Sequence, residues 1–189
     1  WALCDHLRAA EIGITLLSTG LLLKRHAAEL VRRCDDVVVS LDGPQPIHDQ
    51  IRNIPRAYAR LAEGVAAVKA ADPCVSVSAR CTVQRSNFQH LRATVAAAHE
   101  LGLDRVSFLA ADVSSEAFNR PGGWDDLRAG EVALRADDLP QLAAELGALE
   151  QEFAGDFASG FIAESPTKLR RRLHQHYAAL HGQADFHPN

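Results

Sequence analysis

Methionine is absent from this 189-residue sequence, and long apolar runs are missing as well. The longest of these runs, such as residues 21–23, fall far short of the ~20 residues that a membrane-spanning helix needs. No secretory signal pattern opens the chain. We therefore expect no membrane partner and a cytoplasmic location. Because the chain starts at Trp1, we expect it to be a processed or shortened piece of something longer.

Closely spaced cysteines are a third absence. None of the gaps between the cysteines matches the C-x2–4-C spacing from which zinc sites and iron–sulfur clusters usually draw their ligands. The four residues are Cys4, Cys34, Cys74 and Cys81. The sequence thus predicts no metal site within the chain. We interpret these cysteines as small buried hydrophobic residues in a reducing cytosol, and disulfides stay open as the alternative.

A strong excess of one charge is also lacking. The formal net charge of −4 and the pI of about 6.1 give no support to a nucleic-acid partner. The basic run Lys168–Arg172 follows a helix start at Ser165 and is interpreted as a solvated helix face. Histidines near the C-terminus have no acidic ligand at helical spacing and are interpreted as solvated. These are His174, His176, His181 and His187. Phosphate-loop, dinucleotide and serine-hydrolase motifs do not occur.

Strands and helices alternate along the first part of the chain. The predicted strands are Ile14–Leu17, Val37–Leu41, Val75–Val83 and Arg105–Ala110. The predicted helices are Ala2–Ala10, Leu21–Arg33, His48–Ala70 and Phe88–Leu101. Pro55 predicts a break near Ile54, and Asn87 is predicted to cap the helix that follows it. This alternation predicts an α/β fold with a parallel sheet and right-handed crossovers.

The pattern changes after residue 112. Asp112–Arg135 has little periodicity and is predicted to be a long loop with one short helix. Asp138–Phe153 is predicted to be a helix, and Phe157–Ala163 to be a fifth strand. Thr167–His181 is predicted to be the last helix, before a tail at Gln183–Asn189.

Polar residues follow the predicted strands where parallel α/β folds bind their ligands. The segments are Ser18-Thr19-Gly20, Ser40-Leu41-Asp42-Gly43, His48-Asp49-x-x-Arg52 and Thr82-Val83-x-x-x-Asn87. In this order they resemble the central strands of radical S-adenosylmethionine enzymes. The resemblance is closest to members that carry a further cysteine-rich, SPASM-type domain after the barrel. It covers roughly residues 1–112.

The resemblance implies a fold and a chemistry. The fold is a partial (β/α)6 barrel, similar to a TIM barrel, with residues 1–112 as the core. Residues 113–189 would form a loop, late barrel elements and C-terminal helices. In the family, a [4Fe–4S] cluster on a C-x3-C-x2-C loop cleaves S-adenosylmethionine to a 5′-deoxyadenosyl radical that abstracts hydrogen from the substrate. This chain has no such loop, so the cluster ligands are expected outside it and the chain alone is expected to be inactive.

The resemblance also assigns cofactor-binding residues, although it assigns no catalytic one. These are Ser18, Thr19, Ser40, Asp42, Arg52, Arg80 and Leu109. Ser18 and Thr19 stand where the family has Thr-Asn. Ser40 matches a family serine near the cofactor, and the alternative is a bond to its own strand end. Asp42 would accept bonds from ribose hydroxyls or would simply form the Asp-Gly-Pro turn.

The remaining assignments also have two interpretations each. Arg52 either pairs with the cofactor carboxylate or forms a salt bridge with Asp42 or Asp49. Arg80, taken as buried, requires either that carboxylate or an acidic neighbour. Leu109 either offers backbone groups to adenine or belongs to the barrel core.

Two functions of different classes follow. The first is a part of a radical enzyme whose substrate is a small molecule, a peptide or a protein. The alternative is a non-catalytic α/β scaffold or binding domain. A barrel enzyme for phosphate-bearing substrates is disfavoured, because no glycine-rich loop follows a late strand. If Ile14–Leu17 is an unpaired sheet edge, oligomers are expected to form through it.

Overall fold

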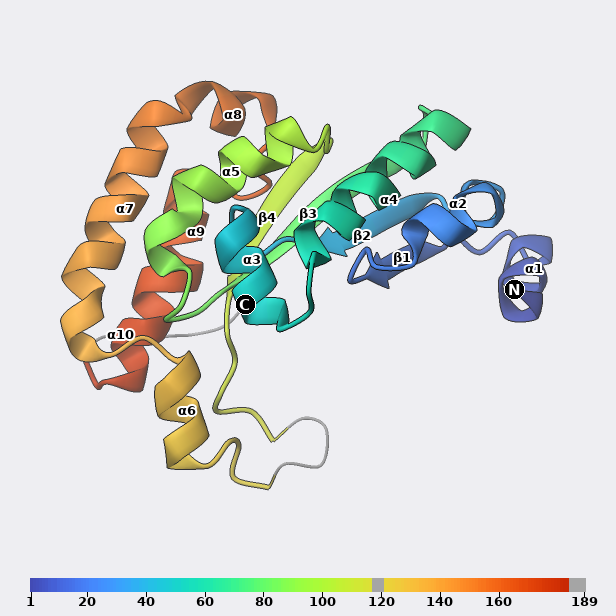
Figure 1. Ribbon diagram of the computed structural model, residues 1–189. Helices are drawn as coiled ribbons and strands as arrows, with labels where there is room; N and C mark the ends of the chain where they lie inside the picture. Colours follow the sequence, from blue (N-terminus) through green and yellow to red (C-terminus); the bar gives the residue numbers. More distant parts are fainter. Residues whose placement is uncertain (117–120, 184–189) are drawn as a thin grey trace. The chain divides into compact units, whose positions relative to one another are not determined.

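The computed structural model describes residues 1–116 and 121–183 of the chain (Figure 1). The chain divides into two compact units, and each is described by itself. Unit 1 consists of Trp1–Cys81 and Ala93–Ser107, and unit 2 consists of Thr82–Arg92 and Phe108–Asn189. No helix in the described ranges is long and apolar enough to cross a membrane.

Four parallel strands form one sheet, and their order in the sheet follows the chain. They are β1 Thr15–Ser18, β2 Asp36–Ser40, β3 Ser76–Val83 and β4 Arg105–Ala110. Each strand begins at or next to its predicted start, and the α/β prediction is confirmed. A sheet that adds each new strand beside the last, with helices between, is built like the wall of a β/α barrel.

The sheet of unit 1 has one covered face and one open face. Val37 and Val39 of β2 pair in register with Val77 and Ala79 of β3, and all four side chains are buried. The alternate positions point the other way, and none of them is buried. This open face consists of Thr15, Leu17, Asp36, Val38, Ser40, Ser76, Ser78 and Arg80. A hollow of about 360 Å³ lies over its amino-terminal end.

Helices pack on the covered face of unit 1. They are α2 Leu23–Val31, α4 Ala57–Ala71 and the unit 1 part of α5 Leu91–Glu100, while α1 Ala2–Ala9 buries no residue. The buried stripe of α4 contains Leu61, Val65 and Val68 at helical spacing. This stripe and the strand valines together form the core that holds the strand ends in place.

The predicted break in the helix region His48–Ala70 is confirmed. The region consists of α3 Gln45–Arg52 and α4, separated by residues 53–56. Asn53 ends α3 in the left-handed conformation with φ of 49°, and Arg56 precedes α4 with φ of 58°. Pro55 cannot continue a helix because it lacks the N–H donor and restricts the residue before it.

Unit 2 is mainly helical. Its helices are η1 Phe88–His90, α6 Asp126–Val132, η2 Ala136–Asp138, α7 Leu139–Glu152, α8 Ala154–Ser159, α9 Pro166–Arg170 and α10 His176–Leu180, with a π-helical segment at Arg171–Gln175. The predicted short helix, the helix after it and the last helix are therefore confirmed, while residues 117–120 of the predicted loop lie outside the described residues. Tail residues 184–189, which include His187, lie outside the described residues.

The prediction of a fifth strand at Phe157–Ala163 is wrong. Its first half is α8, which ends at Gly160 in the left-handed conformation with φ of 77°. Ile162 follows as a single bridge residue and is buried. The alternation of Phe157 and Phe161 around small residues is typical of a strand, but a glycine stop closes a short helix just as well.

Two buried polar side chains hold the last helices of unit 2 to the strands. The Tyr177 hydroxyl donates to the carbonyl of Val83 at 2.6 Å and accepts from the N–H of Ala111 at 3.0 Å. The Glu164 carboxylate accepts from the N–H of Phe108 at 3.2 Å and from Arg172 at 2.7 Å. Three of these bonds, to Val83, Ala111 and Phe108, tie the backbone of β3, of β4 and of the residue after β4 to this helical segment.

The C-terminal basic run and histidines are less solvated than predicted. Within the basic run, Leu169 is buried, Arg170 pairs with Glu150 and Arg172 pairs with Glu164. His176 is half-buried, and burial lowers the pKa of its imidazole. His181 is exposed, but its Nε2 lies 2.8 Å from the carbonyl oxygen of Leu134. Because the apolar face of this helical segment packs against the rest of unit 2, the basic residues and histidines at its borders also contact other parts of the protein.

The cysteines are all free thiols. Cys34 and Cys81 are buried as predicted, whereas Cys74 is exposed and the prediction was wrong for it. Cys74 follows α4 in a turn, where its N–H bonds the Asp72 carboxylate at 2.9 Å. Burial raises the pKa of the Cys81 thiol, and the negative charge of Asp42 raises it further.

Candidate functional site

Ser40 and Arg80 lie side by side at the carboxyl end of the open face. They are register partners on β2 and β3, and the N–H of Leu41 bonds the Arg80 carbonyl at 3.1 Å just beyond them. Arg80 is exposed, so the sequence interpretation of it as a buried arginine was wrong. Its guanidinium forms no ion pair within residues 1–116 and 121–183. This corner of the sheet therefore offers a hydroxyl and an unpaired cation.

Asp42 is held beneath this corner rather than exposed on it. Its side chain is 3% exposed. Arg52 grips it with two bonds, from Nε to Oδ2 at 2.6 Å and from Nη2 to Oδ1 at 2.9 Å. His48 is fully buried, and its Nδ1 lies 3.2 Å from both the N–H of Asp42 and Oδ2. Of the interpretations left open for Arg52, the salt bridge with Asp42 is the one that the geometry shows.

The electrostatics of this group favour an ionised carboxylate. Burial alone would raise the pKa of Asp42, but the bonds from His48 and Arg52 outweigh it and hold the pKa below its usual value. A bidentate guanidinium–carboxylate pair is also geometrically specific. Asp42, His48 and Arg52 thus form a charged latch between the end of β2 and α3.

The other residues of the His-Asp-x-x-Arg segment are engaged as well. The Asp49 carboxylate accepts from the N–H of Tyr58 at 2.7 Å and so satisfies a free donor at the start of α4. The Nε2 atom of His48 is buried and has no hydrogen-bond partner among the described residues. The Tyr58 ring meets the His48 ring edge-on at 6.0 Å. Asp49 and Arg52 therefore both help to fix the segment that follows β2.

Ser18 and Thr19 lie on different faces at the end of β1. Ser18 pairs in register with the buried Val39 and accepts a bond from the N–H of Gly20 at 3.1 Å. Thr19 is exposed, one residue further along. Gly20 has φ of 84°, a left-handed conformation that favours glycine, and a Cβ on it would also clash with the Leu61 side chain. The close approach of α4 therefore requires glycine here and fixes the turn that presents Thr19.

The last sequence-predicted residues belong to unit 2. Leu109 is half-buried on β4. Asn87 is buried and stands at the N-cap position of η1 as predicted, but its side chain forms no capping bond there. Its Oδ1 accepts from the N–H of Gln84 at 2.7 Å and its Nδ2 donates to the Thr82 carbonyl at 3.1 Å. A buried amide that can satisfy the turn after β3 does so in preference to the helix end.

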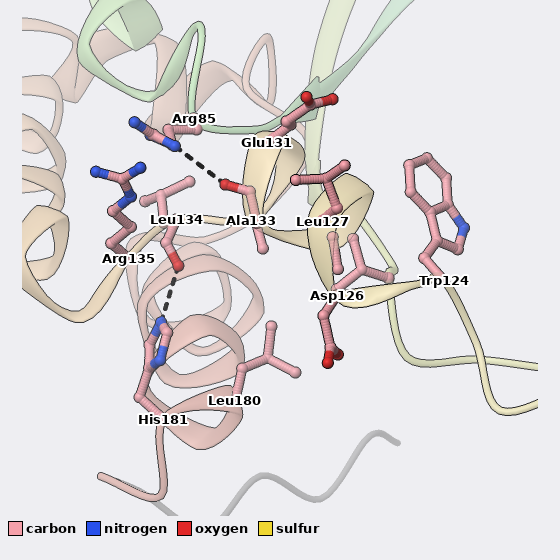
Figure 2. Close-up of a pocket in the computed structure, with 13 residues that line it drawn as sticks. Arg85, Trp124, Asp126, Leu127, Glu131, Ala133, Leu134, Arg135, Leu180 and His181 are labelled. Carbon is pink, nitrogen blue, oxygen red and sulfur yellow. Dashed lines mark hydrogen bonds between the residues drawn. The ribbon is translucent and has the colours of Figure 1, made fainter.

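Sequence reasoning missed a pocket in unit 2 (Figure 2). Its volume is about 670 Å³, and its lining includes Arg85, Trp124, Leu127, Arg135 and His181. These residues come from the turn after β3, the region around α6 and the end of α10. They are far apart in the sequence and form no motif, so only the tertiary structure brings them together.

A metal site does not form within the part of the chain that the structure describes. No group of three or more His, Cys, Asp or Glu side chains there is arranged to hold an ion. The described residues therefore do not fit a [4Fe–4S] cluster. Among the described residues, the Arg80 guanidinium forms no ion pair, and the Ser40 hydroxyl lies beside it on an uncovered face, so these two groups could hold a carboxylate.

Comparisons with known proteins give one informative result. No family model matches the chain, and no curated protein matches it. Two solved structures of native anSMEcpe match it at 18% sequence identity, and each alignment covers 80% of this chain. One, with bound AdoMet and the Cp18Cys peptide, has a TM-score of 0.57, and the other, with bound AdoMet and the Kp18Cys peptide, has 0.56.

These matches show the fold. The chain spans about 40% of the length of the solved chains that it matches. anSMEcpe is an anaerobic sulfatase-maturating enzyme of the radical S-adenosylmethionine, SPASM type, and this portion of it is a partial TIM-barrel-like structure. The partial-barrel prediction is confirmed at the level of the fold.

Proposed function

We propose that this chain is part of a radical S-adenosylmethionine enzyme that acts on a peptide or protein. Within it, residues 1–112 would be the barrel core, and the open face would be part of the cofactor-binding wall. The observation that carries the proposal is Arg80, which has no ion-pair partner in the described part of the chain and lies beside Ser40 at the carboxyl end of that face. The fold likeness supports it, because the similar protein anSMEcpe was solved with AdoMet and a peptide bound.

The proposal assigns a task to four of the seven predicted residues. Arg80 would pair with the carboxylate of the cofactor, and Ser40 would bond a neighbouring polar group. Asp42 and Arg52 would act through their salt bridge, by fixing the backbone that follows Ser40. Thr19, Ser18 and Leu109 complete the predicted set as residues at the ends of β1 and β4.

The group that this wall would hold supplies a hydrogen-abstracting radical when it is bound and reduced, and the cluster that reduces it would be held by residues outside this chain. The residues of the wall would bind the cofactor, orient it and keep its carboxylate neutralised. The scaffold function remains the alternative, and no observation favours it over this proposal.

Binding of radiolabelled S-adenosylmethionine to the 189-residue chain, measured by equilibrium dialysis, tests the proposal. Replacing Arg80 by Gln should weaken binding by about tenfold or more, because one charge-assisted pair is lost. Arg105→Gln is the matched control, since Arg105 is an exposed arginine at the amino end of β4. Ser40→Ala should weaken binding less, with Ser78→Ala as its control on the same face.

The contrast between the two ends of the sheet decides the outcome. Equal effects of Arg80→Gln and Arg105→Gln would mean that the cofactor does not use the carboxyl end. No saturable binding by a cooperatively folded chain would favour the scaffold function instead.

A further inference from the structure

The pocket in unit 2 has the size and the chemical variety of a ligand site. Its volume of about 670 Å³ lies within the ~300–1,000 Å³ typical of small-ligand pockets. It lies in the segments that follow β3 and β4, since Arg85 comes after β3 and Val113 comes after β4. In parallel α/β folds the segments after the strands are where binding residues gather.

Two arginines give one end of the pocket a positive charge. Figure 2 shows the guanidinium groups of Arg85 and Arg135 at the end near Leu134, with Trp124 at the opposite end. Arg85 donates to the carbonyl of Gly130 at 3.0 Å, which fixes its position and leaves donors free. Neither arginine forms an ion pair within the residues that the structure describes. An acceptor with a negative charge is what this end lacks.

The rest of the pocket lining includes exposed apolar side chains and two carboxylates. Leu127 is 79% exposed and Leu180 is 38% exposed, and both line the pocket. Apolar side chains that line a concave site are typical of ligand pockets. Asp126 and Glu131 also line the pocket, so a ligand with several negative charges would be repelled. The ligand should therefore combine a single carboxylate with apolar groups.

We propose that this pocket binds a short peptide segment in which an acidic side chain is flanked by large apolar ones. The acidic side chain would pair with Arg85 and Arg135, and the apolar side chains would cover Leu127 and Leu180. The choice of a peptide rests on the proposed function, and the combination of charge and apolar contact comes from the pocket itself. The segment would be a recognition sequence of the substrate.

The geometry also explains how the pocket keeps its form. The N–H of Arg85 bonds the Val132 carbonyl at 2.9 Å, which ties the turn after β3 to the end of α6. His181 lies 2.8 Å from the Leu134 carbonyl and so ties the end of α10 to the same wall. At the other end, the Arg128 guanidinium stacks on the Trp124 ring at 4.9 Å. The lining of the pocket is therefore preorganised, which lowers the entropic cost of ordering its side chains when a ligand binds.

Fluorescence anisotropy with a labelled peptide, Gly-Ser-Leu-Glu-Leu-Ser-Gly, tests the proposal on the 189-residue chain without added cofactor. The same peptide with Gln in place of Glu should bind about tenfold more weakly. Arg135→Gln should remove this preference, whereas Arg105→Gln, outside unit 2, should keep it. Leu127→Ser should weaken both peptides, with the exposed Leu3→Ser as its control.

Three results would overturn the proposal. Equal affinity for the Glu and Gln peptides would show that the arginines do not recognise the acidic side chain. Absence of saturable binding would show that the pocket does not bind this peptide. A third result would assign the pocket to a fatty acid. In it, sodium decanoate displaces the labelled peptide more strongly from the wild-type chain than from Arg135→Gln, and the Glu and Gln peptides bind equally well. The two proposals are tested by separate measurements. If the peptide does not bind, the proposed function is unaffected, and if S-adenosylmethionine does not bind, the peptide site is unaffected.

Discussion

At the scale of single residues, the latch at Asp42 determines how the end of β2 is held. A carboxylate whose side chain is 3% exposed would be costly alone, but Arg52 supplies two hydrogen bonds and a compensating charge. The latch leaves the hydroxyl of Ser40 and the guanidinium of Arg80 facing outward on the open face. Asp42 thus has a structural role, and Ser40 and Arg80 stay available for a ligand.

Replacing Asp42 by Asn should lower the free energy of unfolding by about 3 kcal/mol at neutral pH, because Arg52 then loses a buried charged partner. Urea denaturation followed by circular dichroism measures the change. Asp137→Asn is the control, since Asp137 is exposed in η2 and should change stability by less than about 0.5 kcal/mol.

The same pair should show a defined pH dependence. The folded pKa of Asp42 lies below its usual value, so its stabilising contribution is present above the unfolded pKa of about 4. It is lost as the pH falls through the folded pKa. The difference in stability between wild type and Asp42→Asn should therefore shrink below about pH 4. A difference that stays constant down to the acid transition would contradict this account.

At the scale of elements, the crossing of α2 and α4 sets the position of the β1 end. Gly64 of α4 lies so close to the segment that starts α2 that an added Cβ would lie 2.8 Å from Leu23 Cβ. It would also lie 2.9 Å from the carbonyl oxygen of Gly20. Glycines on both partners thus let the backbones approach closely, and Thr19 is presented from this junction.

Gly64→Ala should destabilise the protein by about 1–3 kcal/mol, because the added methyl forces backbone apart in a packed core. Gly155→Ala in α8 is a matched control with nothing within 4 Å of the added Cβ. It should stabilise by about 0.5–1 kcal/mol through helix propensity. Thermal melts of the two variants should therefore shift in opposite directions, and a shift of both upward would show that the crossing relaxes freely.

Much of the first half of the fold could be predicted, because short segments rich in apolar residues alternate along the chain with segments whose apolar residues recur at helical spacing. The starts of all four strands and the break at Pro55 follow from local sequence alone. The exposure of Arg80 could not be predicted, since it depends on which face of β3 the helices cover. The prediction of a strand at Phe157–Ala163 was wrong because so short an apolar segment is equally compatible with a short helix and a short strand.

The candidate sites divide in the same way. The polar residues at the strand ends were found because parallel strands bring their ends to one edge. The role of Asp42 was left open between a turn, a ribose contact and a salt bridge, and only the tertiary structure shows that Arg52 reaches it. The pocket around Arg85 and Arg135 has no local signature, because it is assembled from segments that are distant in sequence.

At the scale of the whole molecule, the uncovered parts concentrate near the start of the chain. β1 is at the edge of the sheet, and Leu17 on it is 63% exposed. Within the described residues, most of the large apolar side chains that are exposed occur in this part of unit 1. They are Trp1, Leu3, Ile12, Leu17 and Leu22. In unit 2, by contrast, the N–H of Phe108 on the last strand bonds Glu164.

An edge strand with exposed apolar side chains offers unpaired N–H and C=O groups for pairing with another chain. We therefore predict that the 189-residue chain self-associates with increasing concentration, as sedimentation velocity would show. Leu17→Lys should shift it toward monomer, because a charge on an edge strand opposes pairing. Leu127→Lys is the control, since Leu127 is equally apolar and more exposed but lies in unit 2. A wild-type chain that stays monomeric, or a loss of association only with Leu127→Lys, would rule out the β1 edge as the contact.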